Sequence, residues 1–339
     1  MRLICMMLSL VASATPLAAQ WTLQQSGTSS EFRGLHAVSE RVVWAAGKDG
    51  VVSHTSDGGS SWRADSIPGA SGLFLVAVRA LDDRRAWTLG TAFSAPSAAR
   101  IYFTEDGGRS WRMQYENTTP GVFFDGMAFW DSRRGIAFSD PLDGTFLVIT
   151  TEDGGAHWDR VPAERLPAMT PGEAAFAASG TAITVHGDRE VWIGTGGGPR
   201  ARVFHSNDRG ATWEVFETPA SGGTAKGVFG IAFEDRKHGV AVGGDYQQPT
   251  ASSENLLLTD DGGKRWRIGS SPGLLGVQYG VVHMRGGSYL AAGPGGSAWS
   301  PDEGRTWIRL DGPGFNTVSC AGKICWAGGI EGRVGRLTR

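Results

Sequence analysis

The chain has 339 residues, of which 40% are apolar and 19% are charged, so its composition is that of a globular protein and excludes an intrinsically disordered one. Its formal net charge is −2 and no basic stripe runs along the sequence, which argues against binding to nucleic acid or to an anionic membrane surface. The 51 Gly and 13 Trp residues indicate many tight turns and many short strands anchored by large rings.

The first residues are expected to form a secretory signal. Arg2 supplies a positive start, residues 3–14 are mostly apolar, and Ala18-Ala19 places small residues before a cleavage point. The apolar run is shorter than the ~20 residues that a membrane anchor needs, and no other stretch is long and apolar enough to span a membrane. We therefore expect residues 1–19 to be removed and residues 20–339 to form one domain, in the periplasm or secreted.

Two cysteines remain once the signal is removed. Cys320 and Cys325 flank a short Ala-Gly-Lys-Ile segment, so they are expected to face each other across a hairpin. A disulfide between them suits an oxidising compartment. Two buried thiols suit the sequence equally well, because two cysteines alone fix no framework.

One eight-residue motif recurs six times: Ser or Thr, any residue, Asp, any residue, Gly, two more residues and Trp. The copies span residues 55–62, 104–111, 151–158, 206–213, 259–266 and 300–307. Their Asp residues lie 41 to 55 positions apart and are Asp57, Asp106, Asp153, Asp208, Asp261 and Asp302. Asp and Ser/Thr side chains bond backbone N–H groups of their own loop, and Gly accepts positive φ, so the motif predicts a tight turn. Sixfold recurrence favours a structural role for these Asp residues over a catalytic one.

The Trp that ends each motif is expected to lead the next strand into the space between neighbouring sheets. Burying about 150–250 Å² of such a ring contributes at most about 4–6 kcal/mol. The motif tryptophans are therefore predicted to be major anchors of the fold.

Three short apolar runs, separated by turn residues, precede each motif, which predicts four strands per repeat (a to d). The second run ends in Gly and is found at residues 43–47, 191–194, 240–243, 290–293 and 324–328, among seven such cores. Candidates for strand a lie at 35–38, 75–78, 127–129, 229–233 and 281–283, and those for strand c at 51–54, 101–103, 147–150, 203–205 and 256–258. A β-sandwich is the alternative, but the repeat period favours the blades of a propeller.

The two ends of the sequence are expected to share one blade. Ile324–Gly328 and residues 332–337 read as strands b and c of a seventh repeat, and the sequence stops near the point where a seventh motif would begin. Trp21 matches the Trp that ends a motif, so Trp21–Gln25 is expected to supply the missing outer strand. The predicted fold is an all-β, seven-bladed propeller of four-stranded antiparallel blades, closed by the N-terminal strand.

The repeated motif resembles the Asp-box, or bacterial neuraminidase repeat, of sialidases, sortilins and photosystem II assembly factors. Over roughly residues 21–339 the chain resembles the photosystem II stability/assembly-factor-like propellers, on the six motifs, the Gly-ended strand-b cores and ring closure by Trp21. This resemblance implies that each motif lies on the turn between strands c and d. It also implies an exported scaffold that holds a protein client during assembly, without identifying the client.

Irregular length is concentrated on one predicted face of the propeller. The connections from b to c and from d to a contain the long segments 91–100, 159–174, 219–227 and 245–254, whereas the a–b turns and the motifs are short and alike. Loops gathered on one rim suggest a binding face. Tolerated drift of surface loops is the alternative, because extending a loop costs little.

Ten residues on that rim are candidate ligand contacts. Asp140-Pro-Leu-Asp143 is expected to offer two carboxylates on one tight loop, and exposed rings beside mixed charges suit a protein partner, a peptide or a glycan. The ten are Arg33, Lys48, Phe123, Phe124, Asp140, Asp143, Glu173, Arg200, Asp245 and Tyr246. For any one of them, ordinary solvated charge or blade-edge packing is the competing interpretation.

A glycoside hydrolase is the main alternative to a binding protein. Two acids suffice for that chemistry, and Asp140, Asp143, Glu173 and Asp245 are the candidates. The resemblance to sialidases implies an Arg-Ile-Pro element, three arginines and a Tyr/Glu pair, and the sequence has no Arg-Ile-Pro. We therefore favour a binding protein over an enzyme.

No cofactor is expected. The seven His residues show no H-x-H or H-E-x-x-H spacing, which argues against zinc. Gly194-Thr-Gly-Gly-Gly198 leads from strand to strand, so it does not predict a dinucleotide site. Some chains of this kind are described as oxidoreductases, but no residue pattern here supports a redox cofactor. We expect a monomer that binds a protein client or a glycan and no nucleic acid.

Overall fold

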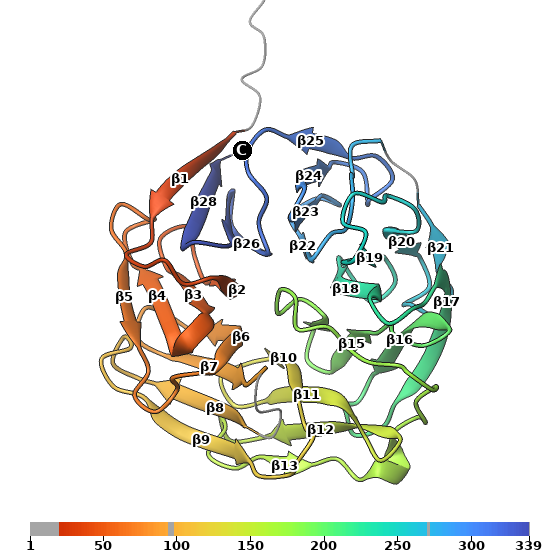
Figure 1. Cartoon of the computed structure of the whole chain (residues 1–339), viewed down its shortest axis with the longest axis horizontal. Helices are drawn as coiled ribbons and strands as arrows, with labels where there is room; N and C mark the ends of the chain where they lie inside the picture. Colours follow the sequence, from red (N-terminus) through yellow and green to blue (C-terminus); the bar gives the residue numbers. More distant parts are fainter. Residues whose placement is uncertain (1–19, 94–97, 270–271, 339) are drawn as a thin grey trace, which may run out of the picture.

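Seven four-stranded antiparallel sheets surround a central axis (Figure 1). The computed structural model describes residues 20–93, 98–269 and 272–338, so the predicted signal lies outside the described residues. In each sheet the strands follow chain order from the axis outward, except that the last sheet takes its outer strand from the N-terminal segment. The predicted seven-bladed propeller is confirmed.

The strand bounds follow the blades in chain order. Blade 1 comprises β2 (Phe32–Ala37), β3 (Val43–Gly47), β4 (Val51–Thr55) and β5 (Arg63–Ser66). Blade 2 comprises β6 (Phe74–Ala80), β7 (Ala86–Thr91), β8 (Ala99–Thr104) and β9 (Arg112–Asn117). Blade 3 comprises β10 (Phe124–Phe129), β11 (Gly135–Leu142), β12 (Thr145–Thr151) and β13 (Asp159–Arg160). Blade 4 comprises β14 (Ile183–His186), β15 (Glu190–Gly194), β16 (Arg200–Ser206) and β17 (Glu214–Ser221). Blade 5 comprises β18 (Lys226–Phe233), β19 (Gly239–Asp245), β20 (Leu256–Thr259) and β21 (Arg267–Ile268). Blade 6 comprises β22 (Gly280–His283), β23 (Tyr289–Gly293), β24 (Gly296–Ser300) and β25 (Ile308–Leu310). Blade 7 comprises β26 (Thr317–Ala321), β27 (Ile324–Gly328), β28 (Arg333–Thr338) and β1 (Trp21–Gln25). Two short 3-10 turns, η1 (Lys48–Gly50) and η2 (Ala163–Arg165), complete the set.

Ring closure takes the form that the sequence predicts. β1 pairs antiparallel with β28, from Trp21 opposite Leu337 to Gln25 opposite Arg333. The Trp21 ring packs on Phe315 at 4.9 Å, and its Nε1 donates to the Ser297 hydroxyl in blade 6 at 2.7 Å. The first strand thus completes blade 7 and also ties it to blade 6.

Each repeated motif forms a hydrogen-bonded turn between strands c and d. In the first copy, Thr55 Oγ1 donates to Asp57 Oδ1 (2.8 Å), and that oxygen also accepts the Ser61 N–H (2.9 Å). The Gly58 N–H donates to the carbonyl of Arg41 in the a–b turn of the same blade. The side-chain pattern recurs in the other five copies, and each is bonded to its own a–b turn. Both kinds of turn therefore occupy one face of the ring.

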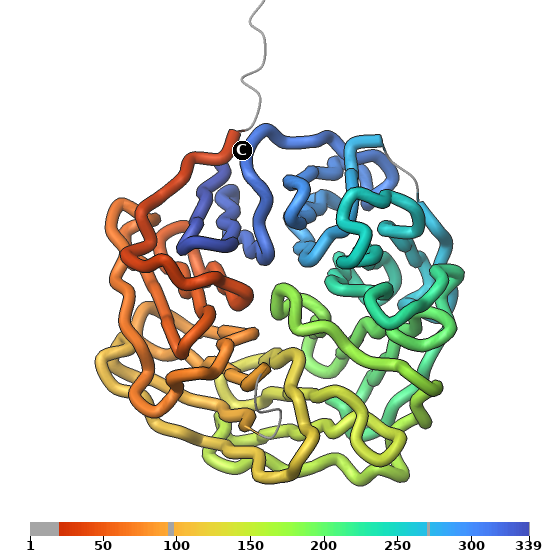
Figure 2. The backbone as a smooth tube through the Cα atoms, in the orientation of Figure 1, coloured from red at the N-terminus to blue at the C-terminus, as the bar shows by residue number. Residues whose placement is uncertain are grey.

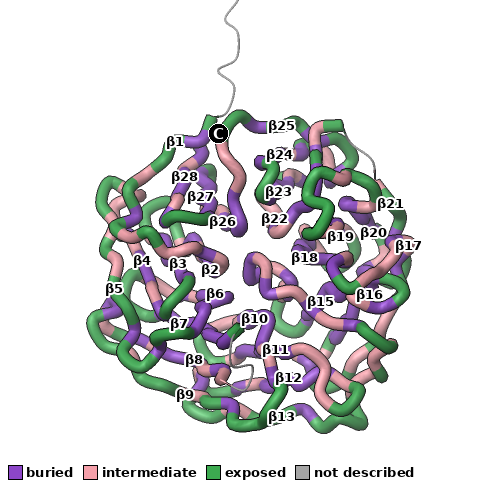
Figure 3. Tube along the Cα trace, in the orientation of Figure 1, coloured by how far each residue is buried: buried purple, intermediate pink, exposed green. Residues whose placement is uncertain are grey.

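The best-buried tryptophans are in strand b and not in the motif turns. Trp44, Trp192 and Trp326 are inaccessible to solvent, whereas four of the six motif tryptophans are only partly buried. The motif tryptophans, predicted to be major anchors of the fold, are thus buried less completely than those of strand b, because the c–d turns lie toward the outside of the ring, beyond the inner strands. Burial falls from β3, all of whose residues are buried, to the mostly exposed β5 (Figure 3).

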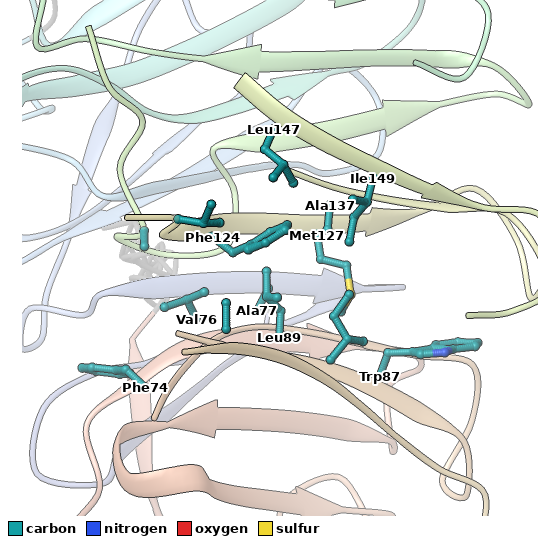
Figure 4. Close-up of a cluster of buried hydrophobic side chains, with 14 residues drawn as sticks. Phe74, Val76, Ala77, Trp87, Leu89, Phe124, Met127, Ala137, Leu147 and Ile149 are labelled. Carbon is teal, nitrogen blue, oxygen red and sulfur yellow. The ribbon is translucent and has the colours of Figure 1, made fainter. Parts of the chain in front are cut away.

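The hydrophobic core lies between the blades. The cluster between blades 2 and 3 brings Trp87 and Leu89 against Met127 and Ile149 (Figure 4). Strand-b tryptophans also reach across this boundary: Nε1 of Trp87 donates to the Gly154 carbonyl in the motif turn of blade 3. Packing and hydrogen bonding therefore fix blade 2 to blade 3.

The connection between β13 and β14 runs to the centre of the ring (Figure 2). We call its inner part, residues 174–182, the central loop. Its carbonyls accept hydrogen bonds from Arg33 of blade 1, Arg79 of blade 2 and Thr317 of blade 7. This loop from blade 4 therefore reaches three other blades and occupies the axial space.

Two remaining features are a disulfide and the lack of a membrane-spanning helix among the described residues. Cys320 and Cys325 lie directly opposite each other on β26 and β27 and form a disulfide. Within residues 20–93, 98–269 and 272–338, no helix has the length and apolarity needed to cross a membrane.

Candidate ligand-binding pocket

A pocket of about 330 Å³ lies beside the central loop, on the face formed by the b–c and d–a connections. Its volume falls in the range of ordinary small-ligand or side-chain sites. Aromatic side chains from several blades and from the central loop dominate its lining: Phe93, Phe123, Phe176, Phe229, Tyr246 and Tyr279. Arg33 and Asp125 are the charged residues that line it. We call this cavity the aromatic pocket.

β-Bulges in the innermost strands turn three of these side chains toward the axis. The pairing of β2, β10 and β18 with their neighbours shifts register at one residue, and that residue is Arg33, Asp125 or Phe229. A bulge redirects the extra side chain away from the ordinary alternation of a strand. The residue after each bulge is Gly, and a Cβ on Gly230 would lie 3.0 Å from the Cα of Gly280 in blade 6. Glycine there lets adjacent inner strands approach closely.

The aromatic wall is a connected set of rings. Phe176 meets Phe229 edge to face with centroids 4.4 Å apart, and Phe229 lies 6.0 Å from Tyr279 and 6.3 Å from Tyr246. Tyr246 keeps 44% of its surface exposed. The pocket therefore has a packed inner part and an open aromatic edge.

Arg33 is held at one side of the pocket. Its guanidinium lies 4.7 Å from the centroid of Phe74 and 5.3 Å from that of Phe93. Its Nε donates to a Glu31 carboxylate oxygen (3.2 Å), and its Nη1 donates to the carbonyl of Ala177 (3.1 Å). Much of its charge and donor capacity is thus already used within the protein.

Two neighbouring carboxyl groups lie at the buried side of the pocket. Asp125 is 0% exposed, and neither of its oxygens has a hydrogen-bond partner among the described residues. Asp140 Oδ1 accepts the N–H of Ala175 at 2.9 Å, and its own N–H donates to the Phe123 carbonyl. Burial raises the pKa of Asp140 to about 6. Burial, and then the charge of Asp140, raise the pKa of Asp125 well above its usual range, and the nearby backbone N–H of Asp140, which donates to the Phe123 carbonyl, offsets only part of this rise.

The structure brings together only part of the predicted site. Arg33, Phe123 and Tyr246 line the aromatic pocket. Asp140 lies directly behind it, bonded to the lining residue Ala175. Phe124 is instead fully buried in the core between blades 2 and 3.

Asp140 and Asp143 do not share one tight loop, contrary to the prediction. β11 continues through Leu142, so Asp140 belongs to a strand, and only Asp143 lies in the following turn, exposed and with φ of 53°. The Asp140 side chain is committed to Ala175, and that of Asp143 is at the surface.

Glu173 is a structural anchor of the d–a connection before blade 4. Its buried carboxylate pairs with Arg202, and it accepts hydrogen bonds from Thr195 Oγ1 (2.7 Å) and from the backbone and hydroxyl of Thr170. It does not line the aromatic pocket.

The other three predicted contacts also lie outside the pocket lining. Asp245 Oδ1 accepts the N–H of Gln247, which makes it a turn residue. Lys48 begins η1 and is exposed, and exposed Arg200 donates to the Pro219 carbonyl. The four acids proposed as a catalytic set are therefore dispersed among different local structures.

Asp125 is the principal pocket residue that sequence reasoning missed. A signal for it exists, because Phe124-Asp125-Gly126 repeats the pattern Phe32-Arg33-Gly34 at the same position of its blade. When the inner strands of the repeats are aligned with one another, Asp125 and Arg33 occupy equivalent positions, at the bulge. The described part of the chain holds no group of three or more His, Cys, Asp or Glu residues suited to a metal ion.

Comparison with known proteins gives matches in structure only. The sequence matches no protein-family model, and no curated protein is significantly similar to it. A structure of YCF48 bound to a D1 peptide matches with a TM-score of 0.67 and 14% identity, covering 96% of this chain and 99% of the other. The likeness lies in the fold.

Two further solved structures show the same architecture over nearly their full lengths. YCF48 from Cyanidioschyzon merolae matches with a TM-score of 0.66 and 16% identity, over 94% of this chain and 99% of that one. The WD40 propeller domain of Doa1 matches with a TM-score of 0.65 and 14% identity, over 95% and 98%. The seven-bladed arrangement is therefore shared with propellers of quite different sequence.

Proposed function

We propose that this protein is an exported binding or assembly scaffold, and that it holds a protein partner on the face formed by its b–c and d–a connections. The observation that carries the proposal is the aromatic pocket on that face, in which exposed Tyr246 continues a wall of packed rings. Aromatic residues and arginine are enriched at the energetic centres of protein interfaces. The match to a YCF48 bound to a D1 peptide supports it, since that propeller of the same fold takes a peptide.

Export is part of the same proposal. The apolar segment that begins with Arg2 has the features of a secretory signal, and the Cys320–Cys325 disulfide suits an oxidising compartment. Expression of the full chain in a bacterial host, followed by fractionation and mass measurement, tests this. The proposal expects a processed chain that begins at Gln20 outside the cytoplasm, whereas an unprocessed cytoplasmic chain would contradict it.

The binding face is tested by capture with matched variants of the processed chain. The pocket variant combines Arg33→Ala with Tyr246→Ala, and the control combines Arg41→Ala with Arg84→Ala, two exposed residues of a–b turns on the opposite face. We expect proteins of a periplasmic extract that the parent retains to be lost from the pocket variant and kept by the control. Equal retention by both variants would show that this pocket is not where partners bind.

A glycoside hydrolase is the second candidate, and one observation favours it. Asp125 and Asp140 are neighbouring carboxyl groups with raised pKa values, as a catalytic acid requires. Assay of the parent and of Asp140→Asn on a panel of chromogenic glycosides tests this candidate. Turnover that disappears in the variant would establish the enzyme, and no turnover by the parent would leave the scaffold as the better account.

A further inference from the structure

We propose that the aromatic pocket receives a cationic side chain, lysine or arginine, of the bound protein, with Asp125 as its counter-charge. This proposal rests on the proposed function, because it names what the binding face recognises there. It draws on three independent features of the pocket: the arrangement of its rings, the unpartnered carboxyl group and the balance of nearby charges.

The rings provide a surface that attracts cations. A cation within about 6 Å of an aromatic face is stabilised by the ring quadrupole, more strongly when water is excluded. One guanidinium of the protein already uses this effect, since Arg33 lies over Phe74 and Phe93. No cation of the described residues lies over Phe176, Phe229, Tyr246 or Tyr279, which form the other wall. That wall has room for a second cation.

Asp125 supplies the matching charge. It lines the pocket, it is 0% exposed, and both of its oxygens lack partners among the described residues. A buried polar group without a hydrogen bond is costly and rare, so its presence calls for an explanation. The carboxylate is closed to water in the unliganded protein, so a ligand ammonium or guanidinium reaches it only by displacing side chains that line the pocket. A cation that does so would satisfy the carboxylate and would gain a charge-assisted hydrogen bond.

The charges around the pocket favour a cation over an anion. Arg33 is the only cation that lines it within the described chain, and it is paired with Glu31 and bonded to the Ala177 carbonyl. With both carboxyl groups ionised, Asp125 and Asp140 leave the pocket negative. An anion would meet these two groups, and an apolar side chain would leave Asp125 unsatisfied, so a cation is the ligand that the pocket fits best.

Binding of a cation should depend on pH in a defined direction. Asp140 on β11 is the charged group that acts on Asp125, and the other titratable groups of the pocket are Tyr246 and Tyr279 on the aromatic wall and Arg33, which is paired with Glu31. Burial keeps the two Asp residues protonated to higher pH than usual, and a ligand cation stabilises their ionised forms. The affinity should therefore rise as the pH rises through the range in which these carboxyl groups titrate.

Fluorine NMR of the chain labelled with 3-fluorotyrosine tests the proposal with a local readout. The chain has five Tyr residues, and two of them, Tyr246 and Tyr279, line the pocket. The probes are end-blocked tripeptides Gly-Lys-Gly, Gly-norleucine-Gly and Gly-Glu-Gly. We expect the lysine peptide to shift the Tyr246 and Tyr279 signals at a concentration at least about tenfold lower than the norleucine peptide, and more so at pH 8 than at pH 5.

Two variants make the test specific. Asp125→Asn should remove the preference for lysine over norleucine, while Asp143→Asn, at an exposed turn, should keep it. Should Asp125→Asn fail to fold, the parent protein alone still tests the proposal, because its binding of the lysine peptide should be stronger at pH 8 than at pH 5. Equal shifts from the lysine and norleucine peptides, a stronger effect of the glutamate peptide, or no shift at all would overturn the cationic pocket. The capture experiment separately decides whether the face binds protein.

Discussion

Burial of the Asp140 carboxyl group makes the stability of the folded protein depend on pH. Its carboxyl group has one backbone donor and little water, and its pKa rises to about 6. In the unfolded chain the same group ionises near pH 4. Between these two values the unfolded state releases a proton that the folded state keeps, so folding loses stability as the pH rises.

The Asp140→Asn variant should remove this pH dependence. The difference between a pKa near 4 and one of about 6 corresponds to on the order of 3 kcal/mol, all of which is lost by pH 7. Urea unfolding of the parent and of the variant at pH 4 and pH 7 measures it, with Asp143→Asn as the control. We expect the variant to gain stability relative to the parent on going from pH 4 to pH 7. An unchanged difference would mean that the Asp140 carboxyl group is not buried as described.

Tryptophan residues of strand b connect neighbouring blades. Trp192 is fully buried, stacks on Phe233 of blade 5 at 3.8 Å, and donates from Nε1 to the Gly262 carbonyl of that blade at 2.8 Å. Trp326 is equally buried, but its Nε1 has no hydrogen-bond partner among the described residues. The two positions differ in this hydrogen bond and in the stacking of Trp192 on Phe233 and His205, which a Phe ring at position 192 can keep in part.

Replacing these two tryptophans by phenylalanine keeps an aromatic ring at each position and removes the inter-blade hydrogen bond only at position 192. Both changes remove ring volume, but only Trp192→Phe breaks a hydrogen bond and leaves a carbonyl unsatisfied. We expect Trp192→Phe to cost about 1 kcal/mol more than Trp326→Phe in the free energy of unfolding, measured with urea. A larger loss for Trp326→Phe would show that the inter-blade hydrogen bond is not a source of stability.

Much of the element structure was predictable, because it follows from short local patterns. The Gly-ended cores 43–47 and 324–328 match β3 and β27, and Trp21–Gln25 matches β1. The aromatic pocket was predicted only in part, through Arg33, Phe123 and Tyr246. The bulge residue Asp125 could have been found from the Phe-x-Gly pattern that it shares with Arg33. The contacts of the central loop join residues far apart in the sequence and leave no local signal.

The whole molecule depends on its closure. The ring is closed only while its last blade has all four strands, and here β1 supplies the fourth. Trp21 is buried against Phe315 and is bonded to Ser297 of blade 6, whereas Leu23 on the same strand is 58% exposed. The two side chains therefore offer a matched pair of substitutions.

Trp21→Ala should weaken the entire ring. We expect a loss of about 3–5 kcal/mol in the free energy of unfolding, and no more than about 0.5 kcal/mol for Leu23→Ala. Thermal and urea unfolding followed by circular dichroism give both values. Similar small losses for the two variants would mean that the first strand is not needed to hold the propeller closed.

Site-specific photo-crosslinking tests most directly whether the face with the aromatic pocket is the binding face. A photoreactive phenylalanine analogue replaces Tyr246 at the edge of the pocket or, as the control, Ser60 in a motif turn on the opposite face. Each purified chain is irradiated in an extract of exported proteins. We predict discrete protein adducts from position 246 and none from position 60. Adducts from position 60 alone, or equally from both, would contradict the assignment of the binding face.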